Sequence, residues 1–167
     1  MTVRGKKYMM HYQIKKKAFS LGDTFTITDA QGEPTYTAKS VILSIGHQLD
    51  LVDIAGHPVS HIKQRVPSLA PDYLISRDGQ LVVEVRRDLL NLLHPHFAME
   101  GPGGSYDVHG DWLNWNYTVE SGGQQIAHID KQFALTDTYQ VDVADGGDIP
   151  TILCLAIILD EVAHQKR

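Results

Sequence analysis

The histidines are the first residues in this sequence whose chemistry suggests a site. There are nine of them, and imidazole is a common metal ligand. The closest pair is His94 and His96, separated by Pro95, with His109 downstream. However, there is no HExxH motif and no pair of cysteines at zinc spacing. We therefore expect no metal site and no cofactor, and histidines that cap loops and strand ends.

Residues for covalent catalysis are equally scarce. The single cysteine, Cys154, lies inside an apolar run, where a thiol is inert. No G-x-S-x-G motif occurs. The glycine-rich segment 101–104 lacks the GK[ST] ending of a phosphate-binding loop and is better explained as a hairpin turn. We find no catalytic residue and expect a protein that is not an enzyme.

Basic residues recur at a regular position. Lys39, Lys63 and Arg86 each lie seven residues after a glycine in a turn-like sequence, and Lys131 lies eight residues after Gly123. Lys15, Lys16 and Lys17 precede the first such turn, and Arg65 and Arg87 are close by in sequence. One interpretation is a basic belt that attracts anionic lipid headgroups, at roughly 1 kcal/mol per residue. The other is that strand ends are ordinarily charged for solubility.

The turns themselves predict the fold. Marker glycines occur at positions 32, 56, 79, 101, 123 and 146, so that a turn recurs every 22 to 24 residues. The segments between them are rich in β-formers and partly alternate polar and apolar residues, as in Thr24 to Thr28. Such a period fits hairpins with strands of about eight to ten residues. We predict ten to twelve strands between about residues 8 and 143.

The C-terminal segment has a different pattern. From about residue 149 to 164 nothing after Pro150 breaks a helix, and Pro150 suits its first turn. Residues 152–159 are apolar on every side, including Ile152, Leu155, Ile158 and Leu159. A helix without a polar face must be buried all round or lie in lipid, and eight residues are too few for a bilayer. We predict a closed antiparallel β-barrel wrapped around this helix, which would also remove exposed strand edges.

Composition restricts the remaining possibilities. A net charge of −5 argues against a nucleic-acid partner. One cysteine allows no intramolecular disulfide, so a cytoplasmic location is the simplest expectation. No signal peptide or transmembrane segment is indicated. We expect residues 1–167 to form one domain.

Several sequence blocks resemble the LURP-one-related family. They are residues 20–29, Ile62–Gln64, Pro71–Tyr73, Gly110–Trp112, Asn116–Val119, Asp137–Val141 and Leu155–Asp160. Their order is more specific than any single block, and the similarity runs from about Tyr8 to His164. That family is similar to the tubby C-terminal domain and the phospholipid scramblases. The resemblance implies a twelve-stranded barrel around a hydrophobic C-terminal helix.

For function, the resemblance implies less. Tubby relatives bind membrane phosphoinositides, and scramblases are associated with calcium and lipid movement. This chain lacks a separate membrane-spanning or acidic calcium segment, so we do not expect scrambling.

Three classes of function remain. The first is a non-enzymatic cytosolic binding domain, peripheral at the membrane, that engages anionic phospholipids or a protein partner through its outer surface. The second is a protein-interaction scaffold without lipid binding, and the third is an enzyme on a small molecule. The third is disfavoured because the helix fills the place where other barrels hold ligands. The sequence does not predict the oligomeric state.

Overall fold

The computed structural model describes residues 8–19, 22–90, 94–111, 115–132 and 137–164, so that Trp112 lies outside the described part. These residues form twelve strands and one helix. Their bounds are β1 Tyr8–Phe19, β2 Gly22–Asp29, β3 Pro34–Ser40, β4 Gln48–Asp53, β5 Pro58–Gln64, β6 Asp72–Arg77, β7 Gln80–Asp88, β8 His96–Gly101, β9 Gly104–Asp111, β10 Asn116–Ser121, β11 Gln124–Lys131, β12 Thr138–Ala144 and α1 Ile149–His164.

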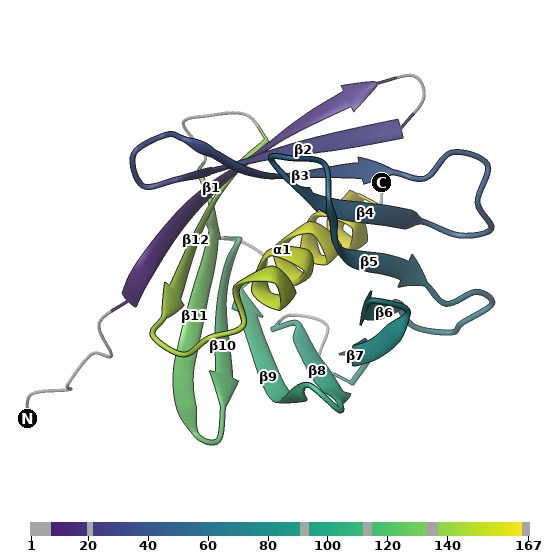
Figure 1. The fold of residues 1–167 in the computed structure, drawn as a ribbon. Helices are drawn as coiled ribbons and strands as arrows, with labels where there is room; N and C mark the ends of the chain where they lie inside the picture. Colours follow the sequence, from purple (N-terminus) through teal and green to yellow (C-terminus); the bar gives the residue numbers. More distant parts are fainter. Residues whose placement is uncertain (1–7, 20–21, 91–93, 112–114, 133–136, 165–167) are drawn as a thin grey trace, which may run out of the picture.

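The strands form a closed antiparallel barrel, as predicted. Each strand pairs with its neighbours in sequence, and β1 closes the barrel by pairing with β12. Figure 1 shows α1 running through the middle of the ring of strands. Because consecutive strands are antiparallel, all odd-numbered strands run in one direction, and their C-terminal ends meet at one end of the barrel.

The two ends of the barrel differ in their connections. At one end, which we call the tight-turn end, short turns join β2 to β3, β4 to β5, β6 to β7, β8 to β9 and β10 to β11. Asp78 and Gly79 are an example, since both have positive φ, as the two-residue hairpin turn requires. At the other end, the long-loop end, longer connections include residues 41–47, 65–71 and 89–95. The marker glycines of the sequence therefore identify the turns of the tight-turn end, and not the connections of the long-loop end.

The barrel interior is apolar because the strands alternate. Phe25 and Ile27 on β2, for example, are completely buried between half-exposed threonines. The helix is buried from Thr151 to Val162, including the four residues predicted from sequence to form its core, Ile152, Leu155, Ile158 and Leu159. A polar helix surface facing this wall would lose its water without gaining partners. From Ile152 to Leu159 the helix is therefore apolar on every side.

Polar contacts hold the N-terminal end of α1. The backbone N–H of Thr151 donates to Oδ1 of Asp148 at 3.3 Å, an N-capping contact. Arg77 at the end of β6 donates to the same carboxylate at 3.0 Å. These contacts join the start of the helix to the tight-turn end. No helix in the described part of the chain is long and apolar enough to cross a lipid bilayer.

Removing volume or adding charge inside the barrel tests this architecture. We expect Leu155→Ala to lower the free energy of unfolding by about 2–5 kcal/mol, because it leaves a cavity. Ile158→Asp would bury an unpaired carboxylate and should prevent folding. Urea denaturation followed by circular dichroism measures both. As a control, Ile54→Ala in the exposed turn after β4 should change stability by less than about 0.5 kcal/mol. A soluble, cooperatively unfolding Ile158→Asp protein would contradict the buried-helix architecture.

Candidate functional site

The described cationic side chains collect at the long-loop end. All lie near the C-terminal ends of odd-numbered strands or just beyond them, apart from Arg77 at the tight-turn end. They are Lys15, Lys16, Lys17, Lys39, Lys63, Arg65, Arg86, Arg87 and Lys131. The sequence places them on odd strands, and the antiparallel topology then brings those strand ends together.

The predicted basic residues Lys39, Lys63 and Arg86 occupy equivalent outward positions. Each alternates with a buried neighbour, as Lys39 does with Ala38, and all three are exposed. Lys39 of β3 pairs with Asp50 of β4. Asp50 in turn pairs with His61 of β5, which lies two residues before Lys63. In the same way, Lys63 pairs with Leu74 of β6, and Leu74 pairs with Glu84 of β7, which lies two residues before Arg86. A constant shift of two residues per hairpin is the stagger of tilted strands in a barrel.

Lys16 faces inward, unlike its neighbours Lys15 and Lys17, which are exposed. Its ammonium lies 2.7 Å from Asp160 and 3.2 Å from Asp23, and its side chain is 7% exposed. Lys16 shares the inward position of Ile14, two residues earlier in β1. This corrects the expectation that the whole run of three lysines lies on the outer surface.

Lys131 also differs from the predicted belt. Lys131 lies two residues after the buried Ile129, and therefore on the same face of β11. Its ammonium lies 5.7 Å from the ring centre of Trp115 and 5.9 Å from that of Tyr139. Lys131 follows its marker glycine by eight residues instead of seven, and side chains on a strand change face at every residue. The one-residue difference explains why it is not equivalent to Lys39.

Carboxylates compensate part of the basic set. Arg65 and Arg86 both contact Glu84, at 2.9 and 2.6 Å, and both lie 3.6 Å from Asp72. Burial raises the pKa of Asp72, and the neighbouring Glu84 raises it further. In contrast, within the described part of the chain Lys15, Lys17, Lys39 and Lys63 have no carboxylate at salt-bridge distance. These four lysines are the cations most available to an anionic ligand.

A groove lies between two of the long loops, next to Lys63. It has a volume of about 720 Å³ and is lined by Ile45, Gln48, Lys63, Gln64, Arg65, Val66, Pro67 and Leu74. Its walls therefore combine two cationic side chains with an apolar surface. Such a lining suits a ligand that is anionic at one end and apolar at the other.

Exposed apolar side chains lie in the described parts of the long loops. Leu43 and Leu90 are 99% and 95% exposed, and Leu69 is fully exposed. Leu43 also has a positive φ of 63°, which is strained for a residue with a Cβ. Ile42, Ile45, Val66 and Leu89 are also exposed in the same connections. Side chains in this position contribute nothing to the barrel core, and large exposed apolar surfaces commonly mark binding sites.

Sequence reasoning overlooked these loop residues. The signal was present in the run Val41-Ile42-Leu43-Ser44-Ile45, where apolar residues continue beyond the end of a strand without its alternation. Deciding that they are exposed required the position of the loop relative to the barrel.

A buried polar cluster lies beneath these loops, where α1 ends. Asp160 is completely buried and accepts hydrogen bonds from Lys16 and from the Tyr139 hydroxyl. The neighbouring Glu161 is nearly buried and lies 3.1 Å from His47 in the first long loop. Burial raises the pKa of Glu161 to about 7; Lys16 opposes the shift, and Asp23 and Asp160 add to it.

The remaining candidates from the sequence do not gather into a reactive site. Cys154 is completely buried, and burial raises the pKa of its thiol to about 12. His96 lies 3.1 Å from Asp107, and its ring centre is 4.9 Å from that of His109. Segment 101–104 forms the hairpin between β8 and β9, as predicted.

The raised pKa of Glu161 predicts a specific pH dependence of stability. Its folded-state pKa of about 7 exceeds the ordinary 4.5. Its contribution is therefore complete below pH 4.5 and is lost as pH rises towards 7. Between pH 5 and 8 the free energy of unfolding should fall by about 2 kcal/mol more in the native protein than in Glu161→Gln. Urea titrations at both pH values measure the difference, and parallel curves would contradict the assignment.

Comparison with known proteins agrees with this fold. A model of the LURP-one-related family matches residues 10–160. The uncharacterized protein YxjI of Bacillus subtilis is 27% identical over 160 residues, which cover 95% of this chain and 97% of that protein. Protein LURP-one-related 15 of Arabidopsis thaliana is 24% identical over 180 residues, covering 96% and 83%.

The structural comparison concerns the fold alone. An X-ray structure of a protein from Arabidopsis thaliana matches with a TM-score of 0.66 at 19% identity, covering 92% of this chain and 91% of that one. The described residues of the blocks that resembled the family in sequence lie in a barrel of the expected architecture, and the family model spans most of the chain. The chain belongs to the LURP-one-related family.

Proposed function

We propose that this protein is a non-enzymatic binding domain whose long-loop end docks on membrane surfaces that contain anionic phospholipids. One observation carries the proposal: exposed leucines in three successive connections, Leu43, Leu69 and Leu90, follow strands whose ends carry the outward-facing cations Lys39, Lys63 and Arg86. Apolar loop residues next to cationic strand ends match the layers of a membrane surface, in which anionic headgroups lie outside the acyl chains.

The uneven distribution of charge would orient the protein at such a surface. The tight turns begin with acidic residues such as Asp29 and Asp53, whose carboxylates accept backbone N–H bonds at 2.9 Å within the turn. These acidic turns lie at the end opposite the lysines. A negative membrane therefore attracts one end and repels the other, despite the overall charge of −5.

The two kinds of contact would contribute comparable energies. Each lysine close to an anionic surface adds roughly 1 kcal/mol. Each leucine side chain that becomes fully buried adds roughly 1.5–3 kcal/mol. Binding would thus need both, with the charge component weakened by salt. A cytoplasmic protein of this kind would be peripheral at the membrane.

The groove beside Lys63 also supports a second candidate, a protein-interaction scaffold. Its cationic and apolar lining suits an acidic peptide with apolar side chains as well as a lipid. In this case the protein would show no affinity for vesicles of any composition.

Neutralising the unpaired lysines tests the electrostatic component. In sedimentation with vesicles of phosphatidylcholine and phosphatidylserine, Lys39→Gln with Lys63→Gln should weaken binding about tenfold or more at low salt. The matched control, Gln31→Glu with Gln80→Glu, changes the net charge equally but at the tight-turn end. It should bind within about twofold of the native protein. Equal losses in both variants would show that only net charge matters.

Removing the apolar tips tests insertion. We expect Leu43→Ser, Leu69→Ser and Leu90→Ser together to reduce vesicle binding at moderate salt at least tenfold, because the apolar contribution is lost. Ile54→Ser provides the control, since Ile54 is 76% exposed at the tight-turn end. Thermal melting should be nearly unchanged in both variants. Full binding by the triple variant would rule out insertion of these loops.

A further inference from the structure

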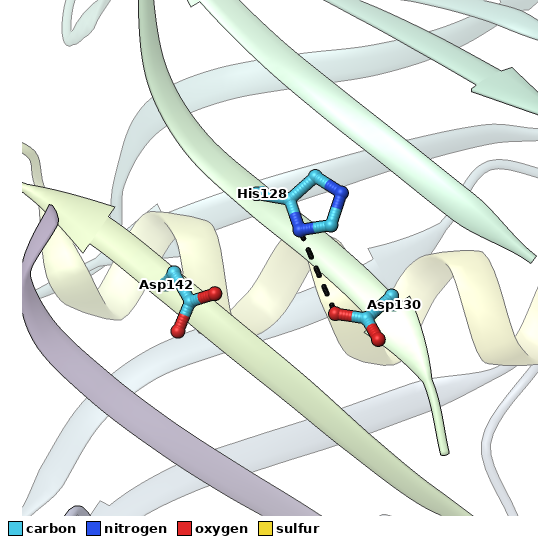
Figure 2. Close-up of side chains that lie close together, drawn as sticks. All are labelled: His128, Asp130 and Asp142. Atoms are coloured by element: carbon cyan, nitrogen blue, oxygen red, sulfur yellow. Dashed lines mark ion pairs between the residues drawn. The ribbon is translucent and has the colours of Figure 1, made fainter. Parts of the chain in front are cut away.

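We propose that His128, Asp130 and Asp142 bind a divalent transition-metal ion such as Zn²⁺ on the outer wall of the barrel. His128 and Asp130 lie on β11, and Asp142 lies on the adjacent strand β12. Figure 2 shows their side chains on these two neighbouring strands. This site lies on the wall formed by β11 and β12 and contains none of the lysines or exposed leucines of the proposed membrane contact.

Strand register brings the three residues together. His128 pairs directly with Asp142, and Asp130 follows on the same face of β11. Asp142 in turn pairs with His11 of β1. The residues between them, such as Ile129 and Val141, are buried in the core, so the polar side chains point outward. A rigid barrel wall therefore presents the cluster, which reduces the cost of organising ligands.

The distances suit a metal ion after a small adjustment. One donor atom from each of the three side chains lies within 4.8 Å of the other two. Nδ1 of His128 lies 3.5 Å from Oδ1 of Asp130. Ligand bonds to zinc of about 2.0–2.2 Å place tetrahedral donor atoms roughly 3.3–3.5 Å apart. We expect rotation of the side chains on the paired strands to close the remaining difference.

The hydrogen bonds around the cluster prepare the imidazole for coordination. Nε2 of His128 lies 2.6 Å from Oδ1 of Asn116, and Nδ1 lies 3.5 Å from Asp130. In the neutral tautomer that donates from Nε2 to Asn116, the lone pair of Nδ1 is available to a metal ion. Outer hydrogen bonds of this kind orient metal-ligating histidines and select their tautomer.

Similar contacts hold the carboxylates. The Gln132 amide donates to Oδ2 of Asp130 at 2.9 Å, and the Gln140 amide donates to Oδ1 of Asp142 at 3.2 Å. His11 contacts Asp142 at 2.7 Å. Both carboxylates are thereby held near the imidazole, with other oxygen lone pairs still available.

The local charge favours a cation. Asp130 and Asp142 are both only partly exposed, and donor atoms of both carboxylates lie within 4.8 Å of each other and of His128. A divalent ion would offset the repulsion between the two carboxylates. One nitrogen and two oxygen ligands suit Zn²⁺ or Co²⁺ better than Ca²⁺, which takes six to eight oxygens.

Metal titration of the tag-free, chelator-treated protein tests the site. With Zn²⁺ in calorimetry and Co²⁺ in visible absorption, we expect one equivalent per chain and intense bands of a four-coordinate Co²⁺ ion. His128→Ala and Asp142→Asn should each lower the affinity at least tenfold, and His11→Ala, which removes an outer contact, about tenfold. Thermal melts without metal confirm that each variant is folded.

Another histidine–aspartate pair provides the matched control. His61 lies 2.6 Å from Asp50, again on neighbouring strands of the outer wall. His61→Ala should leave the affinity for both metals unchanged. Absence of stoichiometric binding would overturn the proposal. So would binding that His128→Ala and Asp142→Asn leave intact, since this would show adventitious coordination by other histidines.

Discussion

Burial of the helix α1, whose residues from Ile152 to Leu159 are all apolar, is the constraint on which the rest of this structure depends. From Thr151 to Val162 the helix has no exposed side, and only a wall that surrounds it can remove so much apolar surface from water. Twelve short strands with alternating residues provide that wall, and closure between β1 and β12 leaves no unpaired edge in the sheet. The helix and the barrel are therefore stable only together.

Filling the barrel determines where function can reside. Since the interior holds the helix, a ligand must bind on the outer wall or at an end. Asp148 with Arg77 at one end of the helix, and Asp160 with Lys16 at the other, tie the helix to the wall by ion pairs. A buried charge of this kind is tolerated because its partner is also in place. The helix termini thus reinforce the two ends, while loops beyond them are free to carry exposed apolar residues.

The alternating direction of the strands also explains how an acidic protein can have a basic end. Tight turns favour aspartate, because its carboxylate accepts backbone N–H groups in the turn, as Asp29 and Asp53 do. Lysines follow near the ends of the odd strands, and topology places them at the other end. Net charge averages these regions, so composition alone does not reveal that the described lysines gather at one end.

The sequence by itself determined the barrel, its turns and the central helix, since these depend on local signals: glycines at a regular interval, alternation as in Thr24 to Thr28, and an apolar run without breakers. It also identified Lys39, Lys63 and Arg86 as equivalent, because a period of one hairpin is visible in one dimension. Only the tertiary structure decided that Lys16 faces Asp160, that Leu43 and Leu69 are exposed, and that His128 lies beside Asp142. Those facts depend on strand register and face, where a shift of one residue reverses the direction of every side chain.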